Sequence, residues 1–240
     1  MTARRVRAGT AVLGVVMALT ATGCSGGGAP DGAEKRTAAA LKVCEEVFGA
    51  GGVAEAREVL DSSRLGAEPP VPGGFRAEGR DLDGIRTAMT GEARAYVPRS
   101  PADRRGHPSY RPCGMAAGDY ENHDVVCRIG GEVTWLSLTA DELADSADYG
   151  NRSNKVAEDL YARQDGGTVA VLPCRVPGAP AAQERGMPLE VRVRAEMVGP
   201  EADLVIGRLL ASLVRDTRER LGCLNPVEVP ATFPFLFPAD

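Results

Sequence analysis

Four side chains near the middle of the sequence are of the types that bind transition metals or act as nucleophiles and bases. In chain order they are His107, Cys113, His123 and Cys127. Imidazole and thiolate groups hold zinc tetrahedrally, and a thiol beside an imidazole can attack a substrate. The spacing fits no standard zinc finger, and a Cys113–Cys127 disulfide beside two exposed histidines explains the same residues. We therefore expect no metal and no cofactor. The alternative hypothesis is an extracytoplasmic enzyme or metal-binding protein that uses these four residues.

Other sequence patterns associated with catalysis are missing. The chain has no Gly-x-Ser-x-Gly elbow, no glycine-rich phosphate loop and no His-Glu-x-x-His motif. Its formal net charge is −5, from 28 basic and 33 acidic residues, which makes a nucleic acid an unfavourable partner. These features favour a protein that binds over one that catalyses.

The N-terminus has the three parts of a secretory signal peptide. Arg4, Arg5 and Arg7 supply a positive charge, residues 8–20 are almost entirely apolar, and small residues lead into Cys24. The apolar stretch is shorter than the roughly 20 residues that a membrane-spanning helix needs. Residues 1–23 are therefore predicted to direct export and then to be removed.

The residues around the predicted cleavage site are similar to a known processing motif. Ala21-Thr22-Gly23-Cys24 resembles the lipobox of bacterial lipoproteins, with Ala21 at the position that is usually leucine. The resemblance implies that Cys24 is acylated, with palmitate or a similar chain, and anchors the protein in the bilayer on the extracytoplasmic face of the cell membrane. An ordinary secretory signal followed by an unmodified Cys24 is the alternative. The glycine-rich residues 24–32 are typical of a flexible tether, which leaves 33–240 as a single domain.

The rest of the chain alternates between helical and extended patterns. We expect helices over 33–48, 53–60, 84–97 (capped by Asp83), 139–147, 154–164 and 200–221, strands over 124–129, 132–138, 168–174 and 189–197, loops over 64–79 and 98–112, and an extended tail over 227–238. Gly130-Gly131 is predicted to form the turn of a hairpin. The strand 189–197 is expected to bury one face and expose the other. In the tail, Phe233, Phe235 and Phe237 alternate, so one side is expected to cover the core.

These elements predict an α+β fold, with an antiparallel sheet, helices packed on one face and disulfides joining the parts. Residues 127–130 and 174–178 are similar, and each precedes a Glu-Val-led strand and then a helix. An internal duplication and chance convergence both explain this similarity.

Five cysteines remain once Cys24 is assigned to the lipid anchor: Cys44, Cys113, Cys127, Cys174 and Cys223. Exported proteins usually pair their thiols, so two disulfides and one leftover cysteine are expected, with the pairing open. The signal, lipobox, glycine tether and cysteine-bearing elements together resemble uncharacterised exported lipoproteins of high-GC Gram-positive bacteria. That resemblance implies that Cys174 pairs with Cys223, and that Cys44 pairs with Cys113 or Cys127.

The loop 98–112 is the only basic segment that suggests a ligand. It carries Arg99, Arg104, Arg105, Arg111 and Tyr110. It could contact an anionic envelope polymer or lipid head groups, although an irregular, solvated surface loop is the interpretation we favour. The sequence as a whole predicts a membrane-anchored extracytoplasmic lipoprotein. Its domain is expected to be a non-catalytic binding or interaction module, with a cell-envelope polymer or a protein as partner and no nucleic acid.

Overall fold

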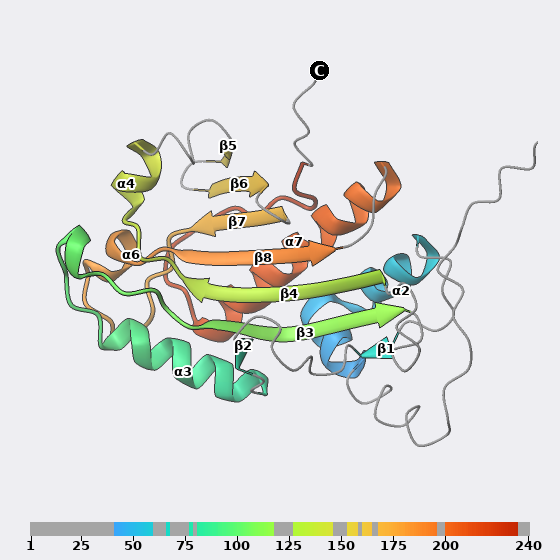
Figure 1. Cartoon of the computed structure of the whole chain (residues 1–240), viewed down its shortest axis with the longest axis horizontal. Coiled ribbons are helices and arrows are strands. Elements are labelled where there is room, and N and C mark those ends of the chain that lie inside the picture. Colours follow the sequence, from blue (N-terminus) through green and yellow to red (C-terminus); the bar gives the residue numbers. More distant parts are fainter. Residues whose placement is uncertain are drawn as a thin grey trace, which may run out of the picture.

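A computed structural model of the chain contains one sheet of eight strands with helices packed against it (Figure 1). The structure describes residues 41–59, 66–67, 77–78, 81–117, 127–145, 153–157, 160–164, 168–195 and 200–234. The predicted signal peptide, Cys24, the tether, His123, Phe235 and Phe237 lie outside these ranges.

The sheet is antiparallel throughout its long strands. The strands are β1 (Gly66–Ala67), β2 (Ala77–Glu78), β3 (Ser109–Ala117), β4 (Cys127–Trp135), β5 (Ser153–Ala157), β6 (Leu160–Gln164), β7 (Thr168–Leu172) and β8 (Leu189–Ala195). Their order across the sheet is β1-β3-β4-β8-β7-β6-β5, and the short β2 pairs with β3 in parallel. The two long strands β4 and β8 therefore lie at the centre, which confirms the predicted antiparallel sheet.

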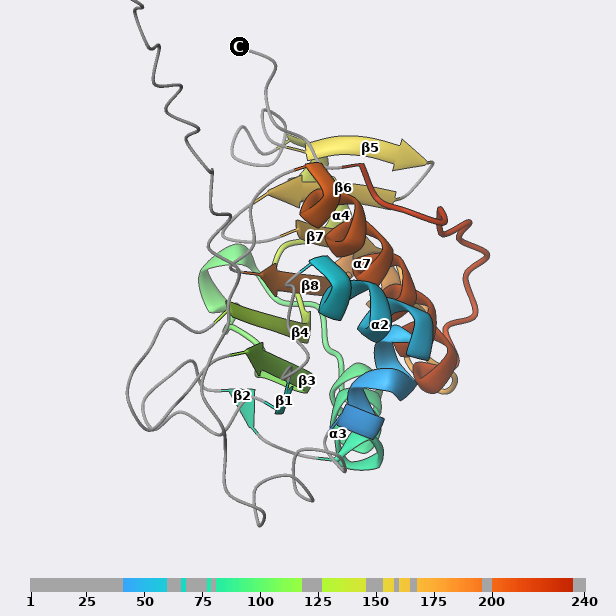
Figure 2. The same cartoon turned by 90° about the vertical axis from the view of Figure 1, so that its right-hand side faces the viewer.

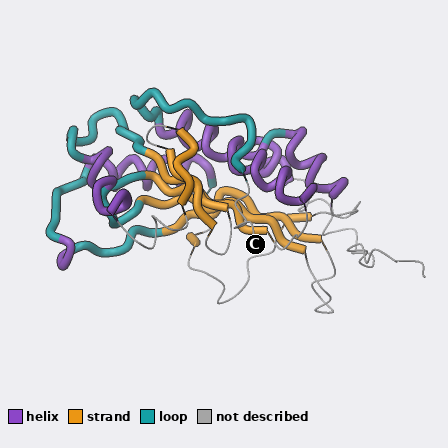
Figure 3. The backbone as a smooth tube through the Cα atoms, turned by 90° about the horizontal axis from the view of Figure 1, so that it is seen from above, coloured by secondary structure: helices purple, strands orange, loops and turns teal. Residues whose placement is uncertain are grey.

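The larger helices cover one face of this sheet (Figures 2 and 3). The helical segments are residues 41–48, α2 (Ala50–Val59), α3 (Leu82–Arg94), η1 (Pro101–Asp103), α4 (Ala140–Asp145), α6 (Gln183–Gly186) and α7 (Pro200–Leu221). Helix α7 packs on β4, β7 and β8, and both α2 and α3 pack on α7. The predicted α+β class, with helices on one face, is confirmed. The short α4 adds a smaller cluster, in which Leu143 contacts Val169 and Val171. These two valines alternate along β7 with the residues that face α7.

Helix α7 forms as its sequence predicts. Pro200 occupies the first helical position, where its missing N–H has no cost, and Gly222 follows the last turn with φ +64°. Leu209, Leu210, Leu213 and Val214 are completely buried against the sheet. Leu204, which lies among the predicted apolar residues, is 53% exposed because its position falls outside this buried stripe.

The predicted hairpin at Gly130-Gly131 is wrong, because both glycines lie inside the continuous strand β4. Gly131 pairs with Cys113 of β3 on one side and with Val193 of β8 on the other, so strand pairing continues through the glycines without a turn. A Cβ atom at Gly131 would lie 2.9 Å from Leu213 Cδ2 and 3.2 Å from Phe48 Cζ. The glycine is needed because the helix layer approaches the strand closely there.

The predicted helix over 154–164 is also wrong, since this segment forms β5 and β6. Strand β7 is buried at every residue and would present unpaired backbone groups if nothing lay beside it. Antiparallel pairing of β6 with β7 satisfies those groups, so the tertiary structure overrides the local helical pattern. The same effect makes short strands of residues 66–67 and 77–78 in the predicted loop 64–79, and starts β3 at Ser109, inside the predicted loop 98–112.

Two smaller expectations change. Asp81, not Asp83, caps α3, because its extended backbone lets Oδ1 accept a 2.6 Å hydrogen bond from the Gly84 N–H. The polar face of β8 is not solvated: Glu190 is 7% exposed and pairs with Arg192 at 3.0 Å. The tail keeps its predicted role through Phe233, which is 1% exposed within the core.

Two disulfides join the helices to the sheet. Cys44, in the helical residues 41–48, bonds to Cys113 of β3, and Cys174, after β7, bonds to Cys223 at the end of α7. The second pair is the one that the resemblance implied, and the first is one of its two options. Cys127 begins β4, but its side chain is outside the described part of the chain. The internal duplication stays a prediction.

Candidate functional site

The candidate site is a cavity of about 260 Å³ at the end of α3. Its walls come from the last turn of α3, the loop 98–108, Ser137 after β4, and α6 with Met187. Segments far apart in the sequence thus meet at one place. Its polar lining includes three arginines, Arg99, Arg104 and Arg105, together with His107 and Glu92.

The loop that carries the arginines is fixed to the end of β4. Thr134 Oγ1 donates a 2.8 Å hydrogen bond to the Pro108 carbonyl, and Ser137 Oγ donates a 2.9 Å bond to the Arg105 carbonyl. In return, Arg104 Nη1 donates a 2.9 Å bond to the Ser137 carbonyl. These contacts hold the part of the loop from Arg104 to Pro108 against the sheet.

Arg104 also forms an ion pair with Glu142, which helps to cap the N-terminus of α4. Glu142 and Thr139 form the predicted capping box: the Thr139 N–H donates to Glu142 Oε2 at 2.8 Å, and the Glu142 N–H donates to Thr139 Oγ1 at 3.2 Å. Hydrogen bonds from Arg104 and Thr139 lower the pKa of Glu142 to about 2. The charge of Arg104 is therefore neutralised within the protein, and its role at the cavity is structural.

Arg99 and Arg105 differ from Arg104 because both are exposed and neither has an ion-pair partner among the described residues. On the other side of the loop, Glu92 joins two residues. Its Oε2 lies 3.1 Å from His107 Nδ1, and its Oε1 accepts a 2.6 Å bond from the buried Tyr110 hydroxyl. These hydrogen bonds do not cancel the charge of Glu92. With Arg104 paired to Glu142, however, the lining still sets two arginines, Arg99 and Arg105, against this one carboxylate, which leaves a surplus of positive charge.

The remaining wall is apolar. It is formed by Ala95, the ring of Tyr96, Val97 and Met187. Tyr96 packs directly on Gly186, where an added Cβ would lie 1.7 Å from the phenol oxygen. A side chain at this position would push Tyr96 away, so the absence of one is what allows the wall to form.

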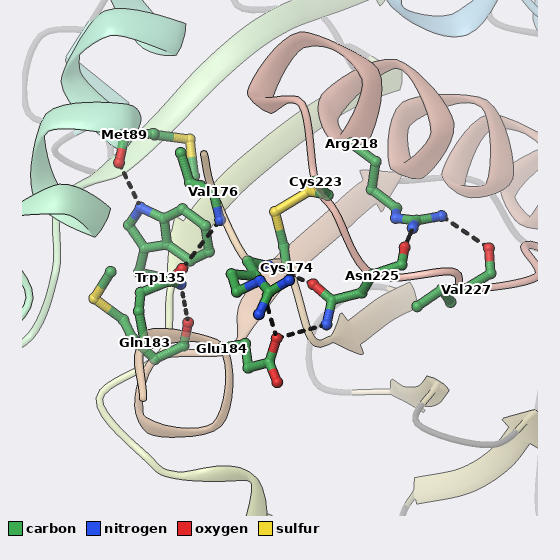
Figure 4. Close-up of a disulfide and its surroundings, with 12 residues drawn as sticks. Met89, Trp135, Cys174, Val176, Gln183, Glu184, Arg218, Cys223, Asn225 and Val227 are labelled. Carbon is green, nitrogen blue, oxygen red and sulfur yellow. Dashed lines mark hydrogen bonds and ion pairs between the residues drawn. A yellow bond between two sulfur atoms is a disulfide. The ribbon is translucent and has the colours of Figure 1, made fainter. Parts of the chain in front are cut away.

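The Cys174–Cys223 disulfide lies beside the hydrogen bonds of Gln183 and Glu184, which belong to α6 (Figure 4). Gln183 is fully buried, accepts a 3.2 Å bond from the Val176 N–H and donates a 3.3 Å bond to the Met187 carbonyl. Asn225 reaches from beyond α7 and donates a 2.8 Å bond to Glu184 of α6. Helix α6 is thus tied to the segment after β7 and to the end of α7.

Of the predicted four-residue metal set, the structure describes the side chains of His107 and Cys113 alone, and each has a partner outside the set. The Cys113–Cys127 disulfide that the sequence suggested is wrong, because Cys113 is bonded to Cys44. Cys113 is therefore oxidised and has no thiolate to bind a metal or attack a substrate. His107 contacts Glu92, while His123 and the Cys127 side chain lie outside the described ranges. Within the described ranges, no group of three or more His, Cys, Asp or Glu residues could hold a metal ion.

The basic loop was identified from sequence, but its partners were not. Arg99, Arg104, Arg105 and His107 line the cavity as a group, whereas Arg111 lies beside Gly130 and 3.8 Å from Glu132 of β4. Sequence reasoning missed Glu92, Tyr96, Gly186 and Met187. No local pattern identifies them, because each belongs to a separate segment and contributes only through the tertiary fold.

Comparison with known proteins gives no relative: no family model, no curated protein and no solved structure matches the chain. Among the residues that the structure describes, none of the helices combines the length and apolar character required to span a bilayer.

Proposed function

We propose that the protein is a membrane-anchored extracytoplasmic lipoprotein whose domain binds an anionic component of the cell envelope without catalysing a reaction. The observation that supports an anionic ligand is the pair Arg99 and Arg105. Both are exposed, both line the cavity, and neither has an ion-pair partner within the described part of the chain. Guanidinium groups bind carboxylates and phosphates through two parallel hydrogen bonds, so unpaired arginines beside a cavity favour such groups.

The anchoring part of the proposal rests on the sequence and is supported by the cysteines. The signal peptide pattern and Cys24 predict export and acylation. Two disulfides suit an oxidising compartment, because cytoplasmic thiols are kept reduced. The loop 98–108, with its side-chain contacts to β4, supports a binding role over a merely solvated surface loop.

Anchoring is tested by fatty-acid labelling and cell fractionation in a Gram-positive host. We expect wild-type protein to take up a palmitate analogue and to remain with the membrane, whereas Cys24→Ala loses both the label and the membrane association. Gly28→Ala, within the tether, is the control and should behave as wild type. Lipid labelling of the Cys24→Ala protein would show that the lipoprotein assignment is wrong.

Ligand charge is tested by binding of the full-length lipidated protein to polyphosphate and to polyglutamate. We expect the double variant Arg99→Gln/Arg105→Gln to bind about tenfold more weakly, with the wild-type affinity falling as salt is added. The charge-matched control is Arg86→Gln/Arg208→Gln, since these two arginines are about half exposed, lie away from the cavity and have acidic partners. Equal losses in both double variants, or no binding by wild type, would refute the proposal.

A further inference from the structure

We infer that the cavity binds the anionic head of a small amphiphile, a carboxylate or phosphate carried on an apolar body. This inference rests on the proposed function and gives its ligand a chemical class. It follows from the division of the cavity into two parts, one charged and one apolar, and from its size.

The charged part is formed by Arg99 and Arg105. Arg104 directly precedes Arg105 in the sequence, but its charge is paired with Glu142 and the same Nη1 atom bonds to the Ser137 carbonyl, so it attracts an incoming anion less than Arg99 and Arg105 do. His107 is likewise engaged at Nδ1 by Glu92. The two exposed arginines are therefore the groups that an incoming anion meets. An anion held there exchanges water for charge-assisted hydrogen bonds.

The apolar part lies on the α3 side. Val97 follows the end of α3 and is 63% exposed, which makes it the most exposed large hydrophobic residue of the described part of the chain. Single exposed apolar residues are ordinary on protein surfaces, but this one lines a cavity together with Ala95 and the Tyr96 ring. An apolar ligand body would cover this surface and remove it from water.

The size of the cavity limits the ligand. At about 260 Å³ it is slightly smaller than the roughly 300–1,000 Å³ typical of small-molecule sites. It therefore has room for one anionic head and a short apolar segment, but not for several units of a polymer. A long envelope molecule could place only an end group there.

The experiment measures binding of hexyl phosphate and hexanoate to the full-length lipidated protein in zwitterionic nanodiscs, with empty nanodiscs subtracted. Inorganic phosphate and hexanol supply the head alone and the body alone. We expect hexyl phosphate to bind at least tenfold more tightly than either of these partial ligands. Nanodiscs containing phosphatidic acid separate two sources of the head: inhibition of hexyl phosphate binding supports a membrane lipid, and no inhibition supports a soluble amphiphile.

Substitutions test separately the charged part and the apolar part of the cavity. Arg99→Gln/Arg105→Gln should weaken hexyl phosphate about tenfold, whereas Val97→Ser should weaken it about threefold and leave inorganic phosphate unchanged. Leu224→Ser is the control, because Leu224 is 54% exposed and does not line the cavity. Equal effects of Val97→Ser and Leu224→Ser, or equal affinity for phosphate and hexyl phosphate, would overturn the inference.

The inference and the proposed function can fail separately. Binding of polyphosphate that depends on Arg99 and Arg105, with no binding of hexyl phosphate or hexanoate, would overturn the inference and leave the proposed function standing. If the wild-type protein bound neither polyphosphate nor hexyl phosphate and hexanoate, both the inference and the proposed function would be overturned.

Discussion

Gly131 of β4 lies directly beneath Leu213 of α7, so close that a Cβ atom on the glycine would be 2.9 Å from Leu213 Cδ2. This contact places the longest helix against the central strand of the sheet. It also explains why a Gly-Gly pair, which is typical of a hairpin turn, occurs inside a strand: the missing side chain lets two layers approach, and no turn is involved.

Gly131→Ala is therefore expected to lower the free energy of unfolding by about 1–3 kcal/mol, since an extra methyl group in a packed core forces its neighbours to move. Urea denaturation measures this. Gly91→Ala is the control: nothing lies within 4 Å of its added Cβ, and within α3 it should stabilise the protein by about 0.5–1 kcal/mol. Leu213→Ala in the same chain should reduce the loss caused by Gly131→Ala, and strict additivity of the two changes would show that they do not touch.

Removal of either disulfide should destabilise the protein by a similar amount. The Cys44–Cys113 and Cys174–Cys223 pairs close segments of 69 and 49 residues, and the entropy of loop closure rises only slowly with length. We expect about 2–4 kcal/mol for each double alanine variant in urea denaturation. The two variants differ at the cavity, because only Cys174→Ala/Cys223→Ala loosens the contacts of α6. Unchanged stability of Cys44→Ala/Cys113→Ala would mean that these cysteines are not bonded in the purified protein.

The pKa of Glu142 predicts a pH-dependent contribution to stability. The pKa of Glu142 in the folded protein, about 2, is below its ordinary value of 4.5. The ionised carboxylate therefore stabilises the folded protein at pH values above 4.5, and this contribution is lost as the pH falls towards 2. Glu142→Gln should therefore be less stable than wild type at pH 7, and the difference in stability should shrink as the pH falls towards 2. Thermal or urea unfolding across this range measures the difference.

Asp141→Asn is the matched control for Glu142→Gln. Asp141 also pairs with an arginine, Arg185, but both side chains are about 70% exposed, so the pair contributes little. A difference between Glu142→Gln and wild type that persisted unchanged at pH 2 would contradict the assigned cause.

Gly186→Ala should disturb the cavity more than the fold. The new methyl group would overlap the phenol of Tyr96, which lies partly exposed and can rotate outwards. We expect hexyl phosphate binding to weaken about threefold while the unfolding midpoint changes little. Gly91→Ala is the control, since Gly91 does not line the cavity and has no atom within 4 Å of its added Cβ. Equal binding by both variants would show that Tyr96 does not shape the site.

The sequence by itself determined the elements whose signals are local. Helix α7 follows from its apolar stripe, Pro200 and Gly222, and the start of α4 follows from Thr139 and Glu142. Each of these signals acts within a few residues, so the surrounding structure has little influence on it. The α+β class also followed from the pattern of such elements.

Only the tertiary structure decided the features that depend on neighbours from distant segments. Residues 153–157 and 160–164 became strands because β7 needed a partner, and Gly131 stayed extended because Leu213 lies above it. The cavity belongs to the same class: Arg99 and Arg105 stood out in the sequence, but Tyr96 and Gly186 became its wall only when α3 and α6 met. Local propensities are worth a fraction of a kilocalorie per residue, and burial and backbone pairing across the fold outweigh them.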